Sequence, residues 1–393
     1  MRWQAWLGSP EIDRPSICEF MIEFKTHGAG AATKSDRRQR RLAPCGCNPY
    51  RVAQTRSNAM SQPENRQFRL IRRPVGHVKR EDFEFRTEPA RAPEAGEIMV
   101  GVEYLSLDPA MRGWMNEGKS YIAPVKLGDV MRAGGVGTII ESKADGFVPG
   151  DVVTGALGIQ TVATLAAEGC IKVDASLAPK PLFISALGMP GMTAYFGLLV
   201  VGEPKSGETV VVSGAAGAVG ALVGQIAKIQ GCHVVGIAGG AEKCRYIVDE
   251  LRFDGAIDYK SDSVPAKLRE LCPKGIDVYF DNVGGQILDD CLAQINLRAR
   301  IVICGAISQY NNTTPVKGPS NYLALLVNRA RMQGMIVFDY ADRYPEGARA
   351  MAGWMKDGRL KSREDIVDGI ETFPETLQKL FTGENFGKLI LKV

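Results

Sequence analysis

The stretch Thr209–Arg245, TVVVSGAAGAVGALVGQIAKIQGCHVVGIAGGAEKCR, decides the fold of this chain. Residues 209–213 form an apolar, β-branched run of strand length, residues 218–230 have helical periodicity, and residues 233–238 form a second apolar strand. The pattern predicts one β-turn-α-β unit with glycines at its first turn.

The glycines at this turn have the spacing G-x-x-G-x-x-G. Because glycine has no Cβ, the pyrophosphate of a dinucleotide can approach backbone N–H groups at the start of the helix. The alternative is a glycine-rich turn of some other α/β protein, and the strand–turn–helix–strand context favours the dinucleotide site. The predicted cofactor contacts at this turn are Gly214, Ala215, Gly217, Ala218, Val219 and Gly220.

The end of the second strand indicates which dinucleotide binds. An NAD-selective site places Asp or Glu there to bind the ribose 2′-OH. This chain instead has two consecutive glycines, beginning with Gly239, followed by Lys243 and Arg245. Glu242 lies three residues beyond the position where an NAD-selective site has its acidic residue, and its charge suits the first turn of a helix. An ordinary solvated lysine is the alternative for Lys243. The pattern predicts NADP(H), with Gly239 and Lys243 near its 2′-phosphate.

The chain before this unit reads as strands. Residues 97–105 and 152–155 have β character, and residues 130–141 form a strand interrupted by glycines, as at a bulge or a barrel corner. We therefore predict a β-rich, barrel-like module over residues 60–187.

Strands and helices alternate from residue 188 onward, which predicts a doubly wound parallel (Rossmann) sheet over residues 188–344 and places the chain in the α/β class. The expected strands are 209–213, 233–238, 255–258, 276–281, 299–304 and 334–338, and the expected helices are 218–230, 241–251, 263–272 and 285–295. In residues 345–393 we expect a helix over 345–358 and a last strand over 388–393 that returns to the first module.

Charge argues against a nucleic-acid partner. Residues 1–59 hold ten Lys/Arg and five Asp/Glu, and the other residues hold 38 and 39, so the body of the protein is nearly neutral. No apolar run is long enough to span a membrane. Residues 1–59 lack a sustained apolar period, and we expect them to be a disordered extension that is dispensable for folding and activity, with the folded chain beginning near Met60.

Nine scattered cysteines without a disulfide framework indicate the reducing cytoplasm. The chain has three histidines and no Cys/His/Glu group with zinc-ligand spacing, so we expect no metal site.

Several motifs resemble the zinc-independent branch of the medium-chain dehydrogenase/reductases, over about residues 66–393. This branch includes the leukotriene B4 12-hydroxydehydrogenase/15-oxoprostaglandin 13-reductases, the alkenal double-bond reductases and the curcumin reductases. The motifs are YLSLDPAMRGWM (104–115), GMPGMTAY (188–195), SGAAGAVG (213–220), AGGAEKC (238–244), DNVGG (281–285), CGAISQYN (304–311) and ENFGKLILK (384–392).

The resemblance implies that the first module is GroES-like. It also implies NADPH-dependent reduction of the carbon–carbon double bond of an enone or enal, without zinc. It makes Tyr310 and Tyr121 candidate catalytic residues that bind the enone oxygen or donate a proton, with structural tyrosines as the alternative. Relatives often have Tyr where this chain has Ala110, which suggests a wider pocket or a different substrate preference.

Three further positions are implied as cofactor contacts, namely Tyr259, Asn282 and Asn385. The resemblance and the apolar strand expected last in the nucleotide fold also predict a homodimer. Two other functions stay open: an NADPH-dependent quinone oxidoreductase, and an NADPH-binding scaffold without turnover. A preference for benzoquinones over alkenones would indicate the quinone oxidoreductase. Tight NADPH binding without turnover of any acceptor would indicate the scaffold.

Overall fold

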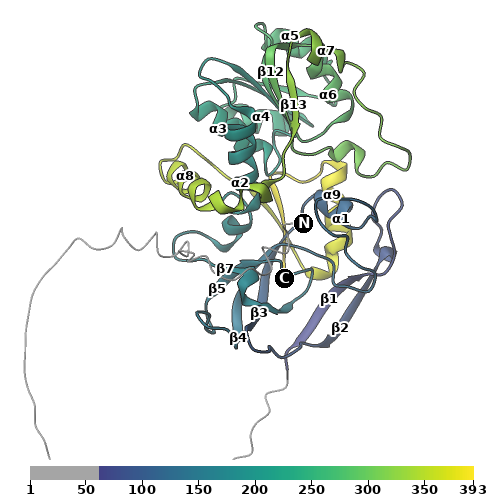
Figure 1. Ribbon diagram of the computed structural model, residues 1–393, viewed down its shortest axis with the longest axis vertical. Helices are drawn as coiled ribbons and strands as arrows, with labels where there is room; N and C mark the ends of the chain where they lie inside the picture. The colour runs from purple at the N-terminus through teal and green to yellow at the C-terminus, as the bar shows by residue number, and fades with distance from the viewer. Residues whose placement is uncertain (1–61) are drawn as a thin grey trace, which may run out of the picture.

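The computed structural model describes residues 62–393, so the predicted extension over residues 1–59 lies outside the described residues. The described chain forms two modules, each built on its own β-sheet (Figure 1). One sheet is largely antiparallel and the other is parallel, which confirms the predicted α/β class with a β-rich module and a Rossmann sheet.

The β-rich module contains a seven-stranded sheet in the order β14-β15-β3-β4-β5-β7, with β6 paired to β3, and a separate β1-β2 pair. Its strands are β1 (Glu64–Leu70), β2 (Phe83–Pro89), β3 (Glu97–Ser106), β4 (Gly135–Ser142), β5 (Val152–Gly155), β6 (Val162–Ala166), β7 (Cys170–Lys172), β14 (Glu364–Asp368) and β15 (Lys388–Lys392). The pairing register shifts twice between β3 and β4, so the bulged geometry expected around residues 130–141 is present.

The end of the chain belongs to this module. Strand β15 pairs with β3, and helix α9 (Phe373–Thr382) packs into the core that also holds helix α1 (Ala110–Trp114). Phe373 is fully buried and its ring lies 5.3 Å from that of Phe68. The last strand therefore lies in the sheet of the first module.

The parallel sheet has the order β10-β9-β8-β11-β12-β13. Its strands are β8 (Thr209–Ser213), β9 (His233–Ala238), β10 (Gly255–Asp258), β11 (Ile276–Asp281), β12 (Ile295–Ile303) and β13 (Arg331–Gly334). One face packs against α2 (Met189–Phe196), α3 (Gly220–Ile229), α4 (Ala241–Asp249) and α8 (Tyr344–Lys356), and the other against α5 (Val264–Leu271), α6 (Gly285–Leu292) and α7 (Leu323–Val327). Helices on both faces confirm the doubly wound arrangement.

The strand predicted over residues 334–338 is wrong in its bounds. The last strand of the sheet is β13, which ends at Gly334, and residues 337–343 form a 3₁₀ helix. Met335 and Val337 are buried in the core between the sheet and α2, so their apolar character reflects packing and not strand pairing. Strand β12 also begins four residues earlier than predicted, beyond a register shift against β11.

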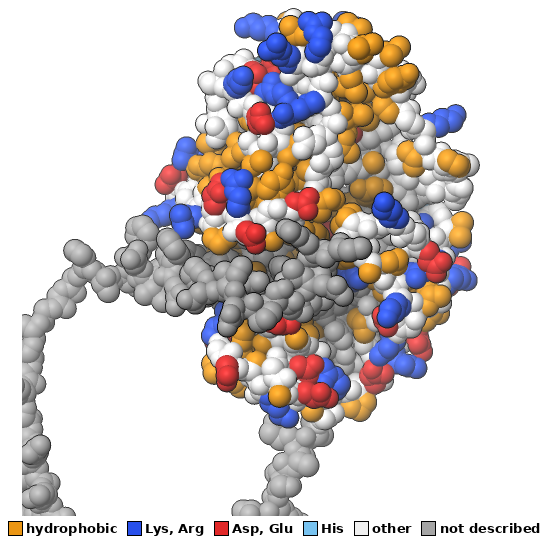
Figure 2. Space-filling model, viewed as in Figure 1, with side chains coloured by type: hydrophobic (Ala, Val, Ile, Leu, Met, Phe, Trp, Pro, Cys, Tyr) orange, Lys and Arg blue, Asp and Glu red, His pale blue; other side chains and the backbone are white. Residues whose placement is uncertain are grey.

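Strand β13 nevertheless occupies the predicted edge of the sheet, and its four residues are exposed. Exposed apolar side chains lie on and beside α7, and Figure 2 shows hydrophobic side chains gathered over the part of the molecule where Figure 1 places this helix. We define the α7 patch as Val316, Tyr322, Leu323, Leu326, Val327 and Met332.

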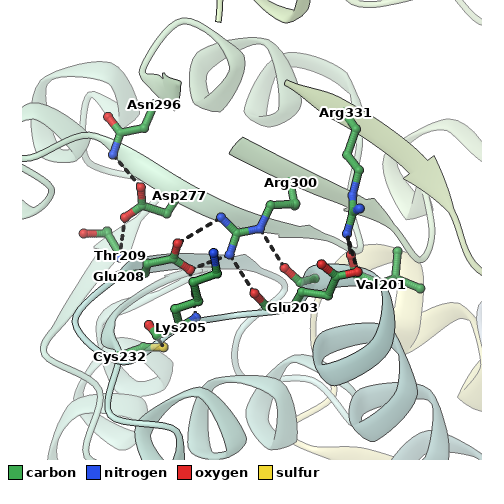
Figure 3. Close-up of polar contacts among 11 residues, drawn as sticks. Val201, Glu203, Lys205, Glu208, Thr209, Cys232, Asp277, Asn296, Arg300 and Arg331 are labelled. Atoms are coloured by element: carbon green, nitrogen blue, oxygen red, sulfur yellow. Dashed lines mark hydrogen bonds and ion pairs between the residues drawn. The ribbon is translucent and has the colours of Figure 1, made fainter. Parts of the chain in front are cut away.

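A polar cluster ties the sheet to the helices beneath it (Figure 3). Arg300 on β12 donates to the carbonyl oxygens of Gly202 at 2.9 Å and Glu203 at 2.8 Å, and pairs with the carboxylate of Glu208. Arg331 on β13 donates to the carbonyl oxygen of Val201 at 2.8 Å. These contacts fix the π-helical segment Gly197–Gly202 and the residue after it against β12 and the edge strand β13. Every helix in residues 62–393 falls short of the length and apolarity that crossing a membrane requires.

Candidate active site

The glycine-rich turn joins β8 to α3 at the carboxyl edge of the parallel sheet. Gly214 has a φ of 60°, and its carbonyl oxygen accepts the Gly217 N–H at 2.9 Å. A Cβ added to Gly220 would lie 2.3 Å from the same carbonyl oxygen, so a side chain here requires the turn to move. The turn fits a pyrophosphate, because that group binds to bare backbone at a helix N-terminus.

The remaining residues predicted at this turn surround it. Ala215 is fully buried and its N–H donates to Ile237 on β9 at 3.1 Å. Ala218 follows Gly217, and Val219 is the residue immediately before α3. The six predicted positions thus lie in the turn and at the first residue of α3, at the edge of the sheet.

The C-terminal segment lies alongside this turn. The N–H of Gly387 donates to the carbonyl oxygen of Ala216 at 3.1 Å, and Gly217 and Gly387 form a parallel bridge. The side chain of Asn385 donates to the carbonyl oxygen of Gly387 at 3.1 Å. Asn385 is therefore brought beside the turn from the opposite end of the fold.

The residues predicted around the 2′-phosphate also lie together. A Cβ on Gly239 would lie 2.8 Å from the ring of Tyr259, so this ring covers the end of β9. The Lys243 ammonium donates to the carbonyl oxygen of Gly383 at 2.7 Å, just past the end of α9. Burial and the nearby Lys260 ammonium lower the pKa of Lys243, and carboxylates oppose them. The negative charge of a phosphate bound at this position would compensate the neighbouring positive charges of Lys243 and Lys260.

Asn282 lies at the end of β11, where its side chain donates to the carbonyl oxygen of Ser213 at 2.7 Å. Its neighbour Asp281 is buried, and one carboxylate oxygen accepts the Ser213 hydroxyl at 2.9 Å and the backbone N–H groups of Val283 and Gly284. Asp281 thus fixes the loop that carries Asn282. Sequence analysis missed this role, although a carboxylate directly after a buried strand is a visible signal.

Tyr310 follows a short 3₁₀ turn after β12. Its phenol oxygen accepts the backbone N–H of Ala306 at 3.1 Å. Burial raises the pKa of Tyr310, the Ala306 N–H opposes this shift, and Cys304, Tyr121 and Asp281 add to it. The phenol is therefore held protonated at neutral pH.

Tyr121 lies in the loop between α1 and β4 and is 46% exposed. Its phenol oxygen accepts the indole N–H of Trp114 at 3.3 Å. Partial burial raises the pKa of Tyr121, and the charges of Asp108 and Cys304 raise it further, whereas the Trp114 N–H and Arg132 lower it.

The two phenols come from different modules and interact electrostatically, because an ionised Tyr121 raises the pKa of Tyr310. Cys304 acts on both phenols, and burial raises the pKa of its thiol to about 12. The neutral Cys304 thiol and the two neutral phenols are therefore close enough for the ionisation of one to affect another. Such a site can donate protons or hydrogen bonds to a developing oxyanion.

A buried ion pair links the C-terminal strand to the loop before α1. The Lys388 ammonium donates to Asp108 at 2.8 Å and to the carbonyl oxygen of Leu107 at 2.7 Å. Ser106 donates to the other oxygen of Asp108 at 2.5 Å. Sequence analysis missed this pair, because its partners are 280 positions apart in the chain.

No group of three or more His, Cys, Asp or Glu side chains within residues 62–393 is arranged to hold a metal ion. The cysteines of this part of the chain are free thiols.

Comparison with known proteins identifies the family. A family model described as the N-terminal domain of oxidoreductase matches residues 66–173, and one described as zinc-binding dehydrogenase matches residues 218–353. The NADPH-dependent curcumin reductase of Escherichia coli is 42% identical over 334 residues, which cover 84% of this chain and 97% of the relative. The chain belongs to the medium-chain dehydrogenase/reductase family.

Two further proteins place this medium-chain reductase among the NADP(H)-dependent oxidoreductases. The NADP(+)-dependent 2-alkenal reductase of Nicotiana tabacum is 40% identical over 336 residues, which cover 84% of this chain and 97% of the relative. The structure of CurA from Vibrio vulnificus in complex with NADPH has a TM-score of 0.80 and 43% identity, and covers 84% of this chain and 99% of the other. The resemblance inferred from the motifs is confirmed.

Proposed function

We propose that this reductase uses NADPH to reduce the carbon–carbon double bond of α,β-unsaturated ketones and aldehydes. The observation that carries the proposal is the pair of phenols, Tyr310 and Tyr121, which come from different modules and lie near enough for the charge of Tyr121 to raise the pKa of Tyr310. Each phenol oxygen accepts an N–H, and among residues 62–393 neither hydroxyl donates to another side chain or carbonyl. The relatives named curcumin reductase and 2-alkenal reductase support the same substrate class.

We propose the glycine turn and its neighbours as the cofactor site. When bound, NADPH supplies a hydride for the β-carbon of the substrate. The chain then has to stabilise the negative charge that develops on the carbonyl oxygen. Tyr310 and Tyr121 donate their O–H groups to this oxygen, and the α-carbon takes up a proton to complete the saturated product.

We propose a role for each cofactor-binding residue from its position. The residues of the turn, Gly214 to Gly220, hold the pyrophosphate, and Lys243 with Tyr259 holds the 2′-phosphate beside Gly239. Asn282 and Asn385 lie at the edges of this site, each anchored to a backbone carbonyl.

A substrate panel tests the proposal. NADPH oxidation is followed with enals, enones and benzoquinones as acceptors, before and after exhaustive chelation. Turnover of enals and enones that survives chelation supports the proposal. Preference for benzoquinones indicates a quinone oxidoreductase, and tight NADPH binding without any turnover indicates a scaffold.

We also propose a homodimer that covers the α7 patch and the exposed edge strand β13. Leu326 and Val327 are 74% and 66% exposed, and an edge strand with free backbone groups is normally paired or covered. Leu326→Glu is expected to give a monomer in light scattering, and Val75→Glu, at an apolar side chain 79% exposed in the other module, is expected not to. A monomeric wild type would refute the dimer.

We expect the protein to bind a small enone or enal, and we expect it to bind neither nucleic acid nor a membrane. We propose the cytoplasm as its compartment, because the described cysteines are free thiols and such thiols persist under reducing conditions.

A further inference from the structure

Arg132 lies just before β4, beside the loop that carries Tyr121. Its guanidinium donates to the carbonyl oxygen of Ala123 at 3.0 Å. The same guanidinium lies over the indole of Trp114, with its carbon 5.7 Å from the ring centroid. Because the Trp114 N–H donates to the Tyr121 phenol at 3.3 Å, Arg132 contacts both the loop and the side chain that hold this phenol.

The charge of Arg132 also acts on this phenol. Burial lowers the pKa of Arg132, and the anionic groups that oppose this shift are Tyr121 first and Asp129 second. In return, Arg132 is the group whose positive charge lowers the pKa of Tyr121, against partial burial, Asp108 and Cys304. The guanidinium keeps its charge at every working pH.

We infer that Arg132 is a positioning residue for Tyr121, which it holds through Ala123 and Trp114 while placing a fixed positive charge beside the phenol. The inference rests on the proposed function, in which Tyr121 donates to the enone oxygen. As negative charge develops on that oxygen, the phenol gives up part of its proton, and a nearby cation stabilises both changes. Without Arg132, the negative charge of Asp108 would act on the phenol with no positive charge from Arg132 to offset it.

Arg73 provides a matched control. It also donates to backbone carbonyl oxygens around Tyr121, those of Met115 at 2.9 Å and Val125 at 2.6 Å, so it holds the same loop. Its charge is not one of the main influences on the pKa of Tyr121, whereas the charge of Arg132 is. A purely structural role of Arg132 would therefore be reproduced by Arg73→Gln.

The test compares Arg132→Gln, Arg132→Lys and Arg73→Gln with the wild type in enone reduction. Arg132→Gln is expected to lower kcat about tenfold, with the KM for NADPH unchanged, and to move the basic limb of the kcat profile upward by about one pH unit, because losing a cation raises the phenol pKa. Arg132→Lys is expected to recover most of kcat, and Arg73→Gln to leave the basic limb in place. In a Tyr121→Phe background, Arg132→Gln is expected to have little further effect.

An equal loss in the Tyr121→Phe background would overturn the inference, as would a wild-type pH profile in Arg132→Gln. A rise in KM for carboxylate-bearing enones as the only effect of Arg132→Gln would also overturn the inference, since Arg132 would then bind the substrate itself. If the wild type reduces no enone, the proposed function fails separately. Titration of the ¹³Cζ NMR signal of Tyr121, assigned with Tyr121→Phe, then decides the inference: a higher pKa in Arg132→Gln supports it and an unchanged pKa refutes it.

Discussion

The phenol oxygen of Tyr310 accepts the backbone N–H of Ala306 at 3.1 Å. This contact orients the ring and uses the oxygen as an acceptor, so the phenol proton is available for a ligand. The N–H also opposes the rise in the Tyr310 pKa that burial causes. Tyr310 is therefore a hydrogen-bond donor whose direction is set by the backbone, which is what stabilisation of an enolate oxygen requires.

Tyr310→Phe is expected to lower the turnover number for an enone about a hundredfold, because one oxyanion donor is lost. NADPH affinity should hardly change. Because the proposed function has Tyr121 donate to the same oxygen, the double variant is expected to lose much more turnover than either single variant. Tyr195→Phe is the control, since that hydroxyl contacts Glu346 on α8. Wild-type turnover in the double variant would show that neither phenol matters.

Lys243→Ala is expected to remove most of the preference for NADPH over NADH. A charge-assisted contact to the 2′-phosphate is worth about 1.5–3 kcal/mol, so the ratio of the two dissociation constants should fall at least tenfold. Lys267→Ala provides the comparison, because it also removes a lysine charge, but one paired with Glu270 on α5. Equal binding of NADPH and NADH by the wild type would contradict this prediction.

Gly220→Ala is expected to destabilise the fold by about 1–3 kcal/mol, because the new methyl group overpacks the turn. It should also weaken NADPH binding, which fluorescence titration measures. Gly353→Ala on α8 is the matched control, since a Cβ there meets nothing within 4 Å, and helix propensity favours Ala by about 0.5–1 kcal/mol. Unchanged urea unfolding and NADPH affinity in Gly220→Ala would show that the turn relaxes freely.

Lys388→Met is expected to cost about 3–5 kcal/mol of unfolding free energy, because it leaves the Asp108 carboxylate buried without its cation. Adding Asp108→Leu should recover part of this loss. Lys267→Met removes the exposed partner of Glu270 and should cost far less, because water screens an exposed ion pair. Chemical denaturation measures all three, and equal losses in Lys388→Met and Lys267→Met would argue against a buried pair.

The sequence contains most of the nucleotide fold, because the signals for it are local. The β-branched run 209–213, the glycines after it and the helix beyond them are contiguous, and the structure has each of them. The apolar run 335–338 misled the strand prediction, because burial against α2 and pairing in a sheet both select apolar residues.

The supporting residues of the site could not be predicted in the same way. Lys388 and Asp108 meet only after the C-terminal strand has joined the first module. Arg132 carries no motif of its own, and its relation to Tyr121 depends on the loop conformation that brings Trp114 between them. Contacts of this kind come from tertiary packing, which a single sequence does not encode in any local pattern.

The most direct test of the account is the fate of label from NADPH deuterated at the transferred position. We expect an enone to be converted to the saturated ketone with deuterium on the β-carbon and hydrogen from water on the α-carbon. Mass spectrometry and NMR of the product locate both atoms. An allylic alcohol with deuterium on the carbonyl carbon would contradict the account, because it would mean reduction of the carbonyl group in place of the double bond.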